Sequence, residues 1–429
     1  MSGIPSDSRL DSTLSFLADP YRFVSARCRE LHTDVFETRL MLRRAVCVMG
    51  EEAARAFYHP NRFTRRGALP VTALMLLQDK GSAAVLDGAA HRHRKQMLMS
   101  LLPPGRVQDL SRAFAREWHA RVARWEGMDH IVLATELARI LTRAVCAWAG
   151  IPLRDVDAKQ RTRELVAMYE GAGAVGPRNW RGMGLRARTE RWARQIIERA
   201  RTGELAAPLD SPVHVLASHR ELDGQLMDPR HAAVELLNLL RPTVAVERYI
   251  TFAAHALVRH PECRDALEAD DDEEYLEWFT QEVRRDYPFF PLVGGRALAA
   301  FEWRGHQFRE GDWVLLDLYG TNHDPRSWSD PDEFRPERFA TQSGSAFNFI
   351  PQGGGNHLAN HRCAGEVVTV ELMKSAIRLL TRTVTYDVPD QDLTIDMSRM
   401  PAVPRSLVVL TNVRWAADAP VLPSQPTTA

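Results

Sequence analysis

The feature of this sequence that most constrains its fold is a long apolar segment, residues 229–260, with Arg241 and Pro242 in its middle. Apolar residues recur at helical spacing on both sides of the pair, which predicts one long helix. A proline inside a helix removes a backbone donor and costs about 3 kcal/mol. An arginine flanked by ELLNLL and TVAV is costly to bury without a partner. We therefore expect Arg241 and Pro242 to serve a function, rather than to be a surface charge beside a tolerated kink.

The composition is that of a globular protein with a large core. The 429 residues are 45% hydrophobic and 26% charged, which excludes a disordered chain. The length would allow about three domains, but no repeat, linker or change of composition divides the chain. We expect a single domain over residues 1–412 and a disordered, proline-rich tail over residues 413–429.

Charge and apolar runs limit the partners of this chain. Lys plus Arg and Asp plus Glu both number 55, so the formal net charge is zero, whereas a dedicated nucleic-acid binder needs a basic surplus. No uncharged apolar run approaches the roughly 18–20 residues of a membrane span, and the N-terminus lacks the pattern of a signal peptide. Five scattered cysteines without a CxxC pair favour a reduced, cytoplasmic protein.

The pattern of residues changes at about residue 290. Before that point most segments have helical spacing, such as residues 130–150, which end at a glycine. Residues 297–320 alternate in short runs with turn signals, which predicts a few strands. A polar, proline-rich stretch over residues 322–339 follows, and another helix begins after Cys363. The predicted fold class is mainly α with a small β part.

Cys363 carries the most specific chemical pattern. The glycine run 353–355 precedes it and a helix starts just after it. A helix N-terminus stabilises a thiolate, and glycines let a thiolate approach a flat ligand closely, as a haem axial ligand requires. Two alternatives remain open, namely a buried free cysteine beside a loop and a zinc site formed with His357 and His361.

A second pattern precedes this loop. Glu282 and Arg285 are three residues apart and can pair on one helix face, and Arg338 can complete a Glu–Arg–Arg cluster. Such a pair alone is common and usually solvated. The order of the patterns along the chain is informative. Glu-x-x-Arg comes first, followed by the strands, the polar stretch and the cysteine loop. This order resembles the cytochrome P450 family over nearly the whole chain, and in that family the cluster holds the polar stretch under the haem.

Longer strings narrow the resemblance to one branch. DSTLSFLADPYRF, DGAAHRHRKQM, EVRRDYPFFP and FNFIPQGGG resemble the bacterial fatty-acid peroxygenases, and most of all their alpha-hydroxylases. The resemblance implies the cytochrome P450 fold, with haem b between the long central helix and the cysteine loop. It also implies Cys363 as the iron ligand and hydrogen peroxide as the oxidant.

The resemblance also gives Arg241 and Pro242 a role. Typical members of the family carry an adjacent acid–alcohol pair at this place in the long helix, and this chain has none. A guanidinium matches a carboxylate, so we expect Arg241 to hold the carboxylate of a fatty acid near the iron. That carboxylate would act as the acid–base group for peroxide, with the alpha and beta carbons nearest the iron. No redox partner would be needed.

Further site residues follow from position in the resemblance. The residues expected to bind the haem propionates are His91, Lys95, Arg296, His361 and Arg65. The residues expected to line the substrate pocket are Ala84, Ala245, Phe289, Phe290, Leu76 and Leu77, and ordinary core packing explains these equally well.

The chain departs from the branch at a few positions. Ala84 stands where hydroxylases carry glutamine and a decarboxylating relative carries histidine, which leaves alpha or beta hydroxylation and decarboxylation open. Glu247 and Arg248 replace small apolar residues, either as an internal pair or as part of a pocket remodelled for a shorter or more polar acid. Ala364 follows the cysteine where relatives often have proline, which removes a restraint on the loop.

Two other functions remain alternatives. One is a redox-partner-dependent monooxygenase of the same family that acts on a smaller natural-product acid. The other is a non-catalytic haem-binding protein. Incubation with peroxide alone separates both from the peroxygenase.

Overall fold

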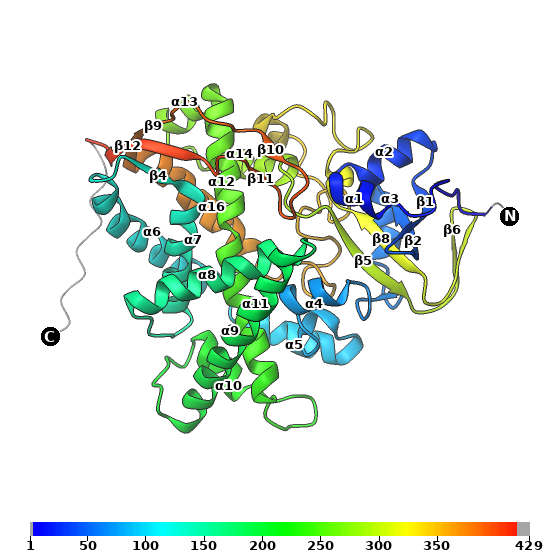
Figure 1. Ribbon diagram of the computed structural model, residues 1–429, viewed down its shortest axis with the longest axis horizontal. Helices are drawn as coiled ribbons and strands as arrows, with labels where there is room; N and C mark the ends of the chain where they lie inside the picture. Colours follow the sequence, from blue (N-terminus) through cyan, green and yellow to red (C-terminus); the bar gives the residue numbers. More distant parts are fainter. Residues whose placement is uncertain (1–2, 418–429) are drawn as a thin grey trace.

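The computed structural model describes residues 3–417 and is mainly helical with a smaller β part, as the sequence predicts (Figure 1). The N-terminal helices are α1 (Thr13–Ala18), α2 (Phe23–Glu30), α3 (Glu51–Phe57), α4 (Val71–Leu77) and α5 (Gly88–Ser100), with a 3-10 turn η1 (Ala83–Val85) before α5. The central helices are α6 (Pro104–Trp125), α7 (Leu133–Trp148), α8 (Asp155–Ala172), α9 (Pro177–Thr202), α10 (Pro212–Ser218), α11 (Pro229–Ala245) and α12 (Glu247–Arg259). The remaining helices are α13 (Pro261–Ala269), α14 (Glu273–Asp286), α15 (Tyr319–Asn322) and α16 (Glu366–Arg378), with the 3-10 helix η2 (Pro336–Ala340) and the π-helix η3 (Leu379–Thr383).

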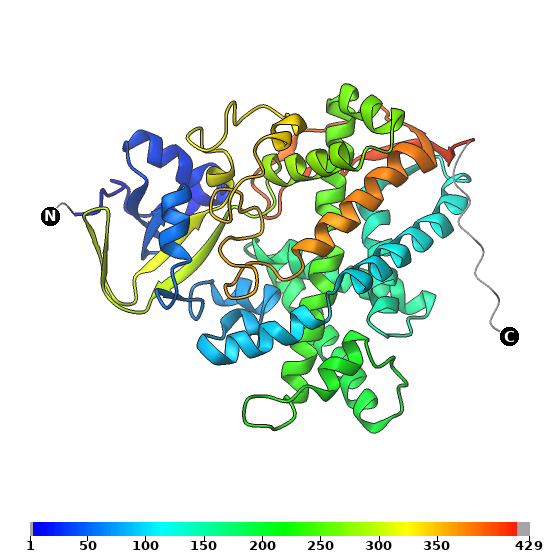
Figure 2. The same ribbon diagram turned by 180° about the vertical axis from the view of Figure 1, so that it is seen from behind.

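The larger sheet has five strands in the order β1-β2-β8-β5-β3. Its strands are β1 (Val35–Leu40), β2 (Arg43–Val48), β3 (Phe63–Thr64), β5 (Leu292–Ala297) and β8 (Trp313–Asp317). The pair β2–β8 is parallel, and the other pairs are antiparallel. The smaller sheets are β4 (His130–Val132), β12 (Val409–Trp415) and β9 (Val384–Asp387); β6 (Phe301–Trp303) and β7 (His306–Phe308); and β10 (Ile395–Asp396) and β11 (Val403–Pro404). The five-stranded sheet and α1–α3 lie at one end of the molecule, and the large helices form the other end (Figures 1 and 2).

The helices α11 and α12 run through the centre of the helical part (Figure 1). Every residue from Glu247 to Leu257 is buried, which is the pattern of a helix enclosed on all sides rather than of a surface helix. Their apolar side chains belong to one large cluster that also includes side chains of α6, α7, α8 and α16. Polar side chains in this central pair are therefore surrounded by core.

The expectation of one continuous helix over residues 229–260 is wrong in one respect. α11 ends at Ala245, α12 begins at Glu247, and Val246 lies between them. Pro242 lies inside α11, and it has no N–H for the carbonyl of Asn238 one turn earlier. The helix is therefore weakened in the turn that precedes its break.

The predicted start of the tail at residue 413 is also too early. In strand β12, Arg414 pairs with Thr385 and Trp415 with Val384, so the strand continues to Trp415. Backbone pairing with a partner strand outweighs the polar composition that suggested a tail. Residues 418–429 of the expected tail lie outside the described residues, and the single domain over residues 1–412 stays a prediction.

Within residues 3–417, none of the helices is both long enough and apolar enough to cross a membrane.

Candidate active site

Cys363 lies on the loop that leads into α16. Its backbone N–H donates to the carbonyl of Gln352 at 3.3 Å, and the side-chain amide of Gln352 donates to the sulfur at 3.9 Å. That amide is held in turn, because it donates to the Thr369 hydroxyl and accepts from Arg284, both at 3.1 Å. The loop therefore presents the sulfur in a fixed position.

The glycines before Cys363 are required by the shape of this loop. Gly353 and Gly355 have φ angles of +91° and +79°, in the left-handed region that favours glycine. A Cβ on Gly354 would lie 2.6 Å from the carbonyl oxygen of Ala346. Larger residues at these positions would force the loop to move, and the cysteine with it.

Cys363 differs from the other cysteines, because it is partly exposed whereas the other four are buried. Desolvation raises the pKa of its thiol, and the nearby carboxylate of Glu366 adds to this effect. The N–H of Gly365 at the start of α16 lowers the pKa as expected for a helix N-terminus, and Lys95 acts in the same direction, but desolvation is larger. A bound cation such as haem iron supplies the missing compensation for a thiolate.

The zinc alternative is wrong. Among residues 3–417, no group of three or more His, Cys, Asp or Glu side chains is placed to hold a metal ion. The His357 ring nitrogen lies 3.0 Å from the carbonyl oxygen of Cys363, and the ring of His361 packs on His91 instead. The three side chains therefore do not converge on one point.

Three of the expected propionate ligands form one cluster of basic groups, and the charge of a fourth, Arg65, acts on it while its guanidinium donates to the carbonyl of Gly294. The rings of His91 and His361 lie 4.0 Å apart, and Lys95 donates to the carbonyls of Asn360 and Arg362 in the cysteine loop. Burial lowers the pKa of His91 to about 4 and that of His361 to about 2. The positive charges of Lys95 and Arg65 contribute to both shifts. None of these four groups has an ion pair with a described carboxylate.

This cluster fits the haem that the cysteine loop implies. Two propionates would bring negative charge to a place where basic groups already depress one another's pKa. The cluster lies beside the cysteine loop, because Lys95 donates to the carbonyl of Arg362 and His361 belongs to that loop. The residues present therefore fit a haem, with Cys363 as its expected ligand and the basic cluster as the expected partner of its propionates.

Arg296 does not join the cluster. Its guanidinium donates to the carbonyls of Gly67 and Gly311 at 3.0 and 3.2 Å and lies over the ring of Trp313 at 5.3 Å. Its backbone pairs with Thr64, next to Arg65, so the two arginines are neighbours in the sheet while their side chains bind different groups. The role of Arg296 in propionate binding stays a prediction.

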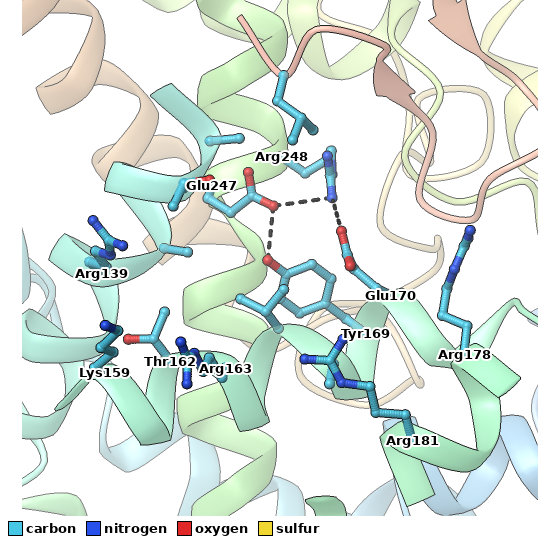
Figure 3. A pocket seen from close by; sticks show the side chains of 16 residues that line it. Arg139, Lys159, Thr162, Arg163, Tyr169, Glu170, Arg178, Arg181, Glu247 and Arg248 are labelled. Atoms are coloured by element: carbon cyan, nitrogen blue, oxygen red, sulfur yellow. Dashed lines mark hydrogen bonds and ion pairs between the residues drawn. The ribbon is translucent and has the colours of Figure 1, made fainter. Parts of the chain in front are cut away.

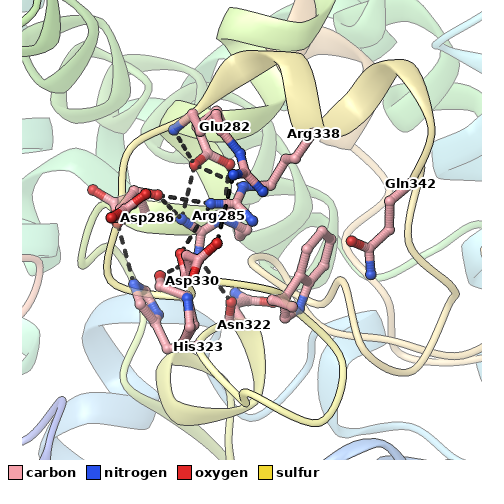
Figure 4. A network of polar contacts seen from close by, with 12 residues as sticks. Glu282, Arg285, Asp286, Asn322, His323, Asp330, Arg338 and Gln342 are labelled. Atoms are coloured by element: carbon pink, nitrogen blue, oxygen red, sulfur yellow. Dashed lines mark hydrogen bonds and ion pairs between the residues drawn. The ribbon is translucent and has the colours of Figure 1, made fainter.

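The expected cluster of Glu282, Arg285 and Arg338 forms in the interior (Figure 4). Arg285 donates twice to the Glu282 carboxylate, at 2.7 and 2.8 Å, and Arg338 donates to it at 3.1 Å. Both arginines also donate to backbone carbonyls of the polar stretch, namely those of Asn322, Ser329, Asp330, Pro331 and Glu333. This network holds the polar stretch against α14.

Arg241 is a buried cation without a counter-charge. It is 5% exposed, and one guanidinium nitrogen donates to the carbonyl of Leu76 at 3.1 Å and to the side chain of Asn238 at 3.2 Å. Across residues 3–417 it makes no ion pair with a carboxylate. Burial lowers its pKa to about 9, and the positive charge of Arg186 contributes. A buried charge without such a partner is costly to the folded protein.

Arg186 shows the contrasting arrangement. It is equally buried and also donates to the carbonyl of Leu76, at 3.4 Å. Unlike Arg241, it has a carboxylate partner, Asp79, at 3.3 Å. Burial in this region therefore does not by itself prevent an arginine from having a carboxylate partner, and Arg241 differs from Arg186 in lacking one.

The residues expected to line the substrate pocket differ in their burial and contacts. Leu76 is fully buried, and a Cβ on Gly171 or Gly182 would meet its side chain at 3.3–3.4 Å, so Leu76 packs in the core as well as binding arginines through its carbonyl. Leu77 is half-buried against the same cluster. Ala245 is buried at the end of α11.

Ala84 lies in η1, which is tied to the central helix. The N–H of Ala83 donates to the Glu235 carboxylate at 2.6 Å, and Arg94 pairs with the same carboxylate at 3.0 Å. Burial raises the pKa of Glu235, and Arg94 opposes this effect. The link fixes the short segment that carries Ala84 beside α11.

Phe289 and Phe290 lie just before β5. The ring of Phe289 stacks on Tyr249 of α12, with centroids 4.2 Å apart and planes 9° apart. Phe290 meets Phe289 edge to face at 4.6 Å and is 37% exposed. Phe290 therefore offers free aromatic surface, whereas Phe289 is largely committed to packing.

Glu247 and Arg248 form the internal pair that the sequence suggested (Figure 3). Their charged groups lie 3.3 Å apart, and both are buried. Tyr169 donates to Glu247 at 2.9 Å, and Arg248 also pairs with Glu170 at 3.3 Å. The prediction of an internal pair is confirmed.

Several supporting residues were not found from the sequence. Asn238 is three residues before Arg241, and helical spacing could have indicated its contact. Gln352 directly precedes the glycine run and could have been suspected for the same reason of proximity. Glu235 and Arg186 act through contacts between distant segments, for which a single sequence gives no signal.

Comparisons with known proteins agree with this arrangement. The cytochrome P450 family model matches residues 259–406. The structure of a variant of cytochrome P450SP alpha is 48% identical, with a TM-score of 0.92 over 95% of this chain and 99% of that chain. Cytochrome P450EX alpha with myristic acid is 39% identical, with a TM-score of 0.93 over 97% of this chain and 100% of that chain. A variant of cytochrome P450 OleT in complex with arachidonic acid is 34% identical, with a TM-score of 0.93 over 97% and 100%.

The fold, the cysteine loop and the Glu–Arg–Arg cluster all agree with these similarities, which extend over almost the full length of this chain and of the solved structures. The chain therefore belongs to the cytochrome P450 family, in the fatty-acid peroxygenase branch that these structures represent.

Proposed function

We propose that this fatty-acid peroxygenase holds the carboxylate of its substrate at Arg241 and uses that carboxylate as the acid–base group when hydrogen peroxide hydroxylates the alpha or beta carbon. The observation that carries the proposal is the buried guanidinium of Arg241, which has no described counter-charge. A fatty acid supplies one carboxylate, so binding would remove the cost of an uncompensated charge.

Haem b is the cofactor of this branch, and the residues that would hold it are Cys363 at the iron and Arg65, His91, Lys95 and His361 at the propionates. When bound, haem with a thiolate ligand supplies cleavage of the O–O bond of peroxide. The chain's own residues then have two tasks, which are to fix the sulfur and to position the substrate.

Positioning would follow from the way Arg241 is held. Its guanidinium is tied to Leu76 and Asn238 through one nitrogen, which leaves other donors of the planar fork for a carboxylate. A carboxylate bound there has its alpha and beta carbons next to it, so these carbons come closest to the reacting oxygen. The remaining alkyl chain would lie on apolar surface such as that of Phe290.

The substrate carboxylate would also move the proton. It would take a proton from one oxygen of hydrogen peroxide and return it to the other, distal oxygen, which leaves as water. Thr251 and Glu247 contact each other at 3.3 Å, but Tyr169 and Arg248 already bind that carboxylate. The carboxylate of Glu247 is therefore a poor substitute for a free acid–base group.

The same reasoning favours function without a redox partner, and the five free cysteines favour the cytoplasm. Peroxide brings both oxygen and electrons, so no reductase is needed. Ala84 has no polar side chain to bind a second substrate group, so it does not select among the possible products. The test below therefore includes the proportions of alpha-hydroxylated, beta-hydroxylated and decarboxylated product.

The proposal is tested by peroxide-driven turnover of myristic acid, with products identified by mass spectrometry. We expect Arg241→Ala to lose at least about 10²-fold in turnover, the usual contribution of an acid–base group. Arg191 is an exposed arginine on α9, and Arg191→Ala should retain the rate of the parent protein. Full activity in Arg241→Ala would refute the proposed role of the carboxylate.

A further inference from the structure

A second basic site lies away from Arg241 and Cys363. A pocket of about 260 Å³ opens between α7, α8, α9 and α12 (Figure 3). Neither Arg241 nor Cys363 lines it. Its floor includes Arg248, which follows Arg241 by seven residues, or about 10 Å along a helix axis.

The rim of this pocket carries cations that lack partners. Lys159 and Arg163 come from α8, and Arg178 and Arg181 from the first turns of α9. In the part of the chain that the structure describes, none of these four side chains makes an ion pair or a hydrogen bond, and Figure 3 shows them around the opening. Exposed arginines elsewhere on these helices often have partners, such as Arg194 with Glu198 at 2.8 Å.

The floor contains a buried guanidinium that is only partly satisfied. Arg248 is 1% exposed, and one of its nitrogens pairs with Glu247 and Glu170, each at 3.3 Å. Its other two nitrogens, Nε and Nη1, are buried and have no hydrogen-bond partner. Buried donors without acceptors are uncommon in native proteins, and each calls for an explanation.

The charge of the lining favours an anion with more than one charge. The cations that line the pocket are Arg139, Lys159, Arg163, Arg178, Arg181 and Arg248, against the carboxylates Glu170 and Glu247. Both carboxylates are already engaged, since Glu247 accepts from Tyr169 and Glu170 accepts from Arg399. A single carboxylate would neutralise only part of this excess.

Apolar side chains complete the lining. The apolar wall is formed by Ala134 and Ala138 of α7, Val166 and Ala167 of α8, and Leu407, beside the hydroxyl-bearing residues Thr135, Thr162 and Tyr169. The pocket therefore offers charge at its mouth and floor together with a small apolar wall, which suits a small organic molecule better than a bare ion.

We propose that this pocket is an anion-binding site for a phosphorylated small molecule, whose phosphate groups are bound by Arg178, Arg181 and the other rim cations and whose apolar part lies on the wall formed by Val166 and Leu407. Arginine forks match phosphate oxygens well. The fatty-acid carboxylate bound at Arg241 carries one charge, so the two sites would accept different anions.

The test is calorimetric titration of the haem-loaded enzyme with inorganic pyrophosphate as the probe and hexanoate as a singly charged comparison. We expect one saturable pyrophosphate site, and we expect affinity to fall as salt is raised, because partly exposed charges are screened. The double variant Arg178→Gln/Arg181→Gln should weaken pyrophosphate binding by about tenfold or more, as loss of two charge-assisted contacts implies. A second double variant, Lys159→Gln/Arg163→Gln, should weaken it in the same direction.

The matched control is Arg191→Gln, which removes an exposed arginine of α9 outside the pocket. It should bind pyrophosphate as the parent protein does. Equal weakening in the control would overturn the proposal, because binding would then reflect diffuse surface charge. A second result would also overturn the proposal. If the parent protein bound hexanoate but not pyrophosphate, and the Arg178→Gln/Arg181→Gln variant lost hexanoate binding, the site would be one for monocarboxylates. Circular dichroism and the haem spectrum of each variant establish that the fold is retained.

Discussion

Arg241 donates a hydrogen bond to the carbonyl oxygen of Leu76, at 3.1 Å, which joins the central helix α11 to the last turn of α4. The contact holds the guanidinium without neutralising it, because a carbonyl carries no net charge. Arg186 donates to the same carbonyl and has Asp79 as its partner. Two buried arginines thus share one acceptor, and only Arg186 also has a carboxylate partner among the described residues.

The uncompensated charge of Arg241 predicts a conflict between stability and function. Replacing it with methionine removes a buried cation while keeping an extended apolar side chain, so Arg241→Met should raise the free energy of unfolding by about 1–3 kcal/mol in the absence of substrate. Thermal denaturation of the haem-loaded enzyme measures this difference. Myristic acid should then raise the melting temperature of the parent protein and leave that of the variant unchanged. A variant that is less stable than the parent without substrate would contradict this account.

The Glu282 cluster predicts the opposite effect. Glu282→Gln would leave Arg285 and Arg338 buried with one charge partner fewer, and breaking a buried pair costs about 3–5 kcal/mol. Urea denaturation followed by the haem absorbance should show this loss. Glu274 is an exposed residue of the same helix, and Glu274→Gln should change stability by less than about 0.5 kcal/mol. Equal effects of the two substitutions would show that the cluster does not hold the fold.

His255 predicts a dependence of stability on pH. Its ring accepts from the hydroxyl of Tyr287 at 2.8 Å and donates to the carbonyl of Leu393 at 3.0 Å, and burial lowers its pKa from 6.5 to about 4. Below about pH 6.5 the unfolded chain binds a proton at His255 that the folded protein does not. Stability contributed by the neutral ring should therefore be complete above pH 6.5 and be lost as the pH falls to about 4.

The measurement is the urea midpoint between pH 7 and pH 4. A pKa difference of this size corresponds to a loss of at most about 3 kcal/mol in the free energy of unfolding between pH 6.5 and pH 4. His255→Gln can keep one donor and one acceptor without titrating, so its midpoint should fall less steeply with pH. The same slope in the parent protein and the variant would assign the pH dependence to other groups.

The parts of the site that the sequence predicted are those set by neighbours in the chain. Cys363 is identified by glycines and a helix start within a few residues, and Glu282 and Arg285 share a helix face by spacing alone. Arg241 stands out because apolar residues surround it in the sequence. The resemblance to the cytochrome P450 family then placed these groups in one fold.

The parts that could not be predicted depend on contacts between distant segments. The contacts of the Arg296 guanidinium with the carbonyls of Gly67 and Gly311 join segments far apart in the chain. The position of the break at Val246, four residues after Pro242, is not indicated by the apolar pattern, which continues through it. The two free nitrogens of Arg248 follow from the positions of Glu170 and Glu247, and no spacing rule reports unsatisfied donors.

The most direct test of the central claim compares myristic acid with its methyl ester in the peroxide reaction. The ester keeps the alkyl chain but has no carboxylate to accept a proton. We predict turnover of the acid, no turnover of the ester alone, and partial turnover of the ester when a short carboxylic acid is added to occupy Arg241. Turnover of the ester at the rate of the acid, without any added acid, would contradict the claim that the substrate carboxylate at Arg241 is the acid–base group.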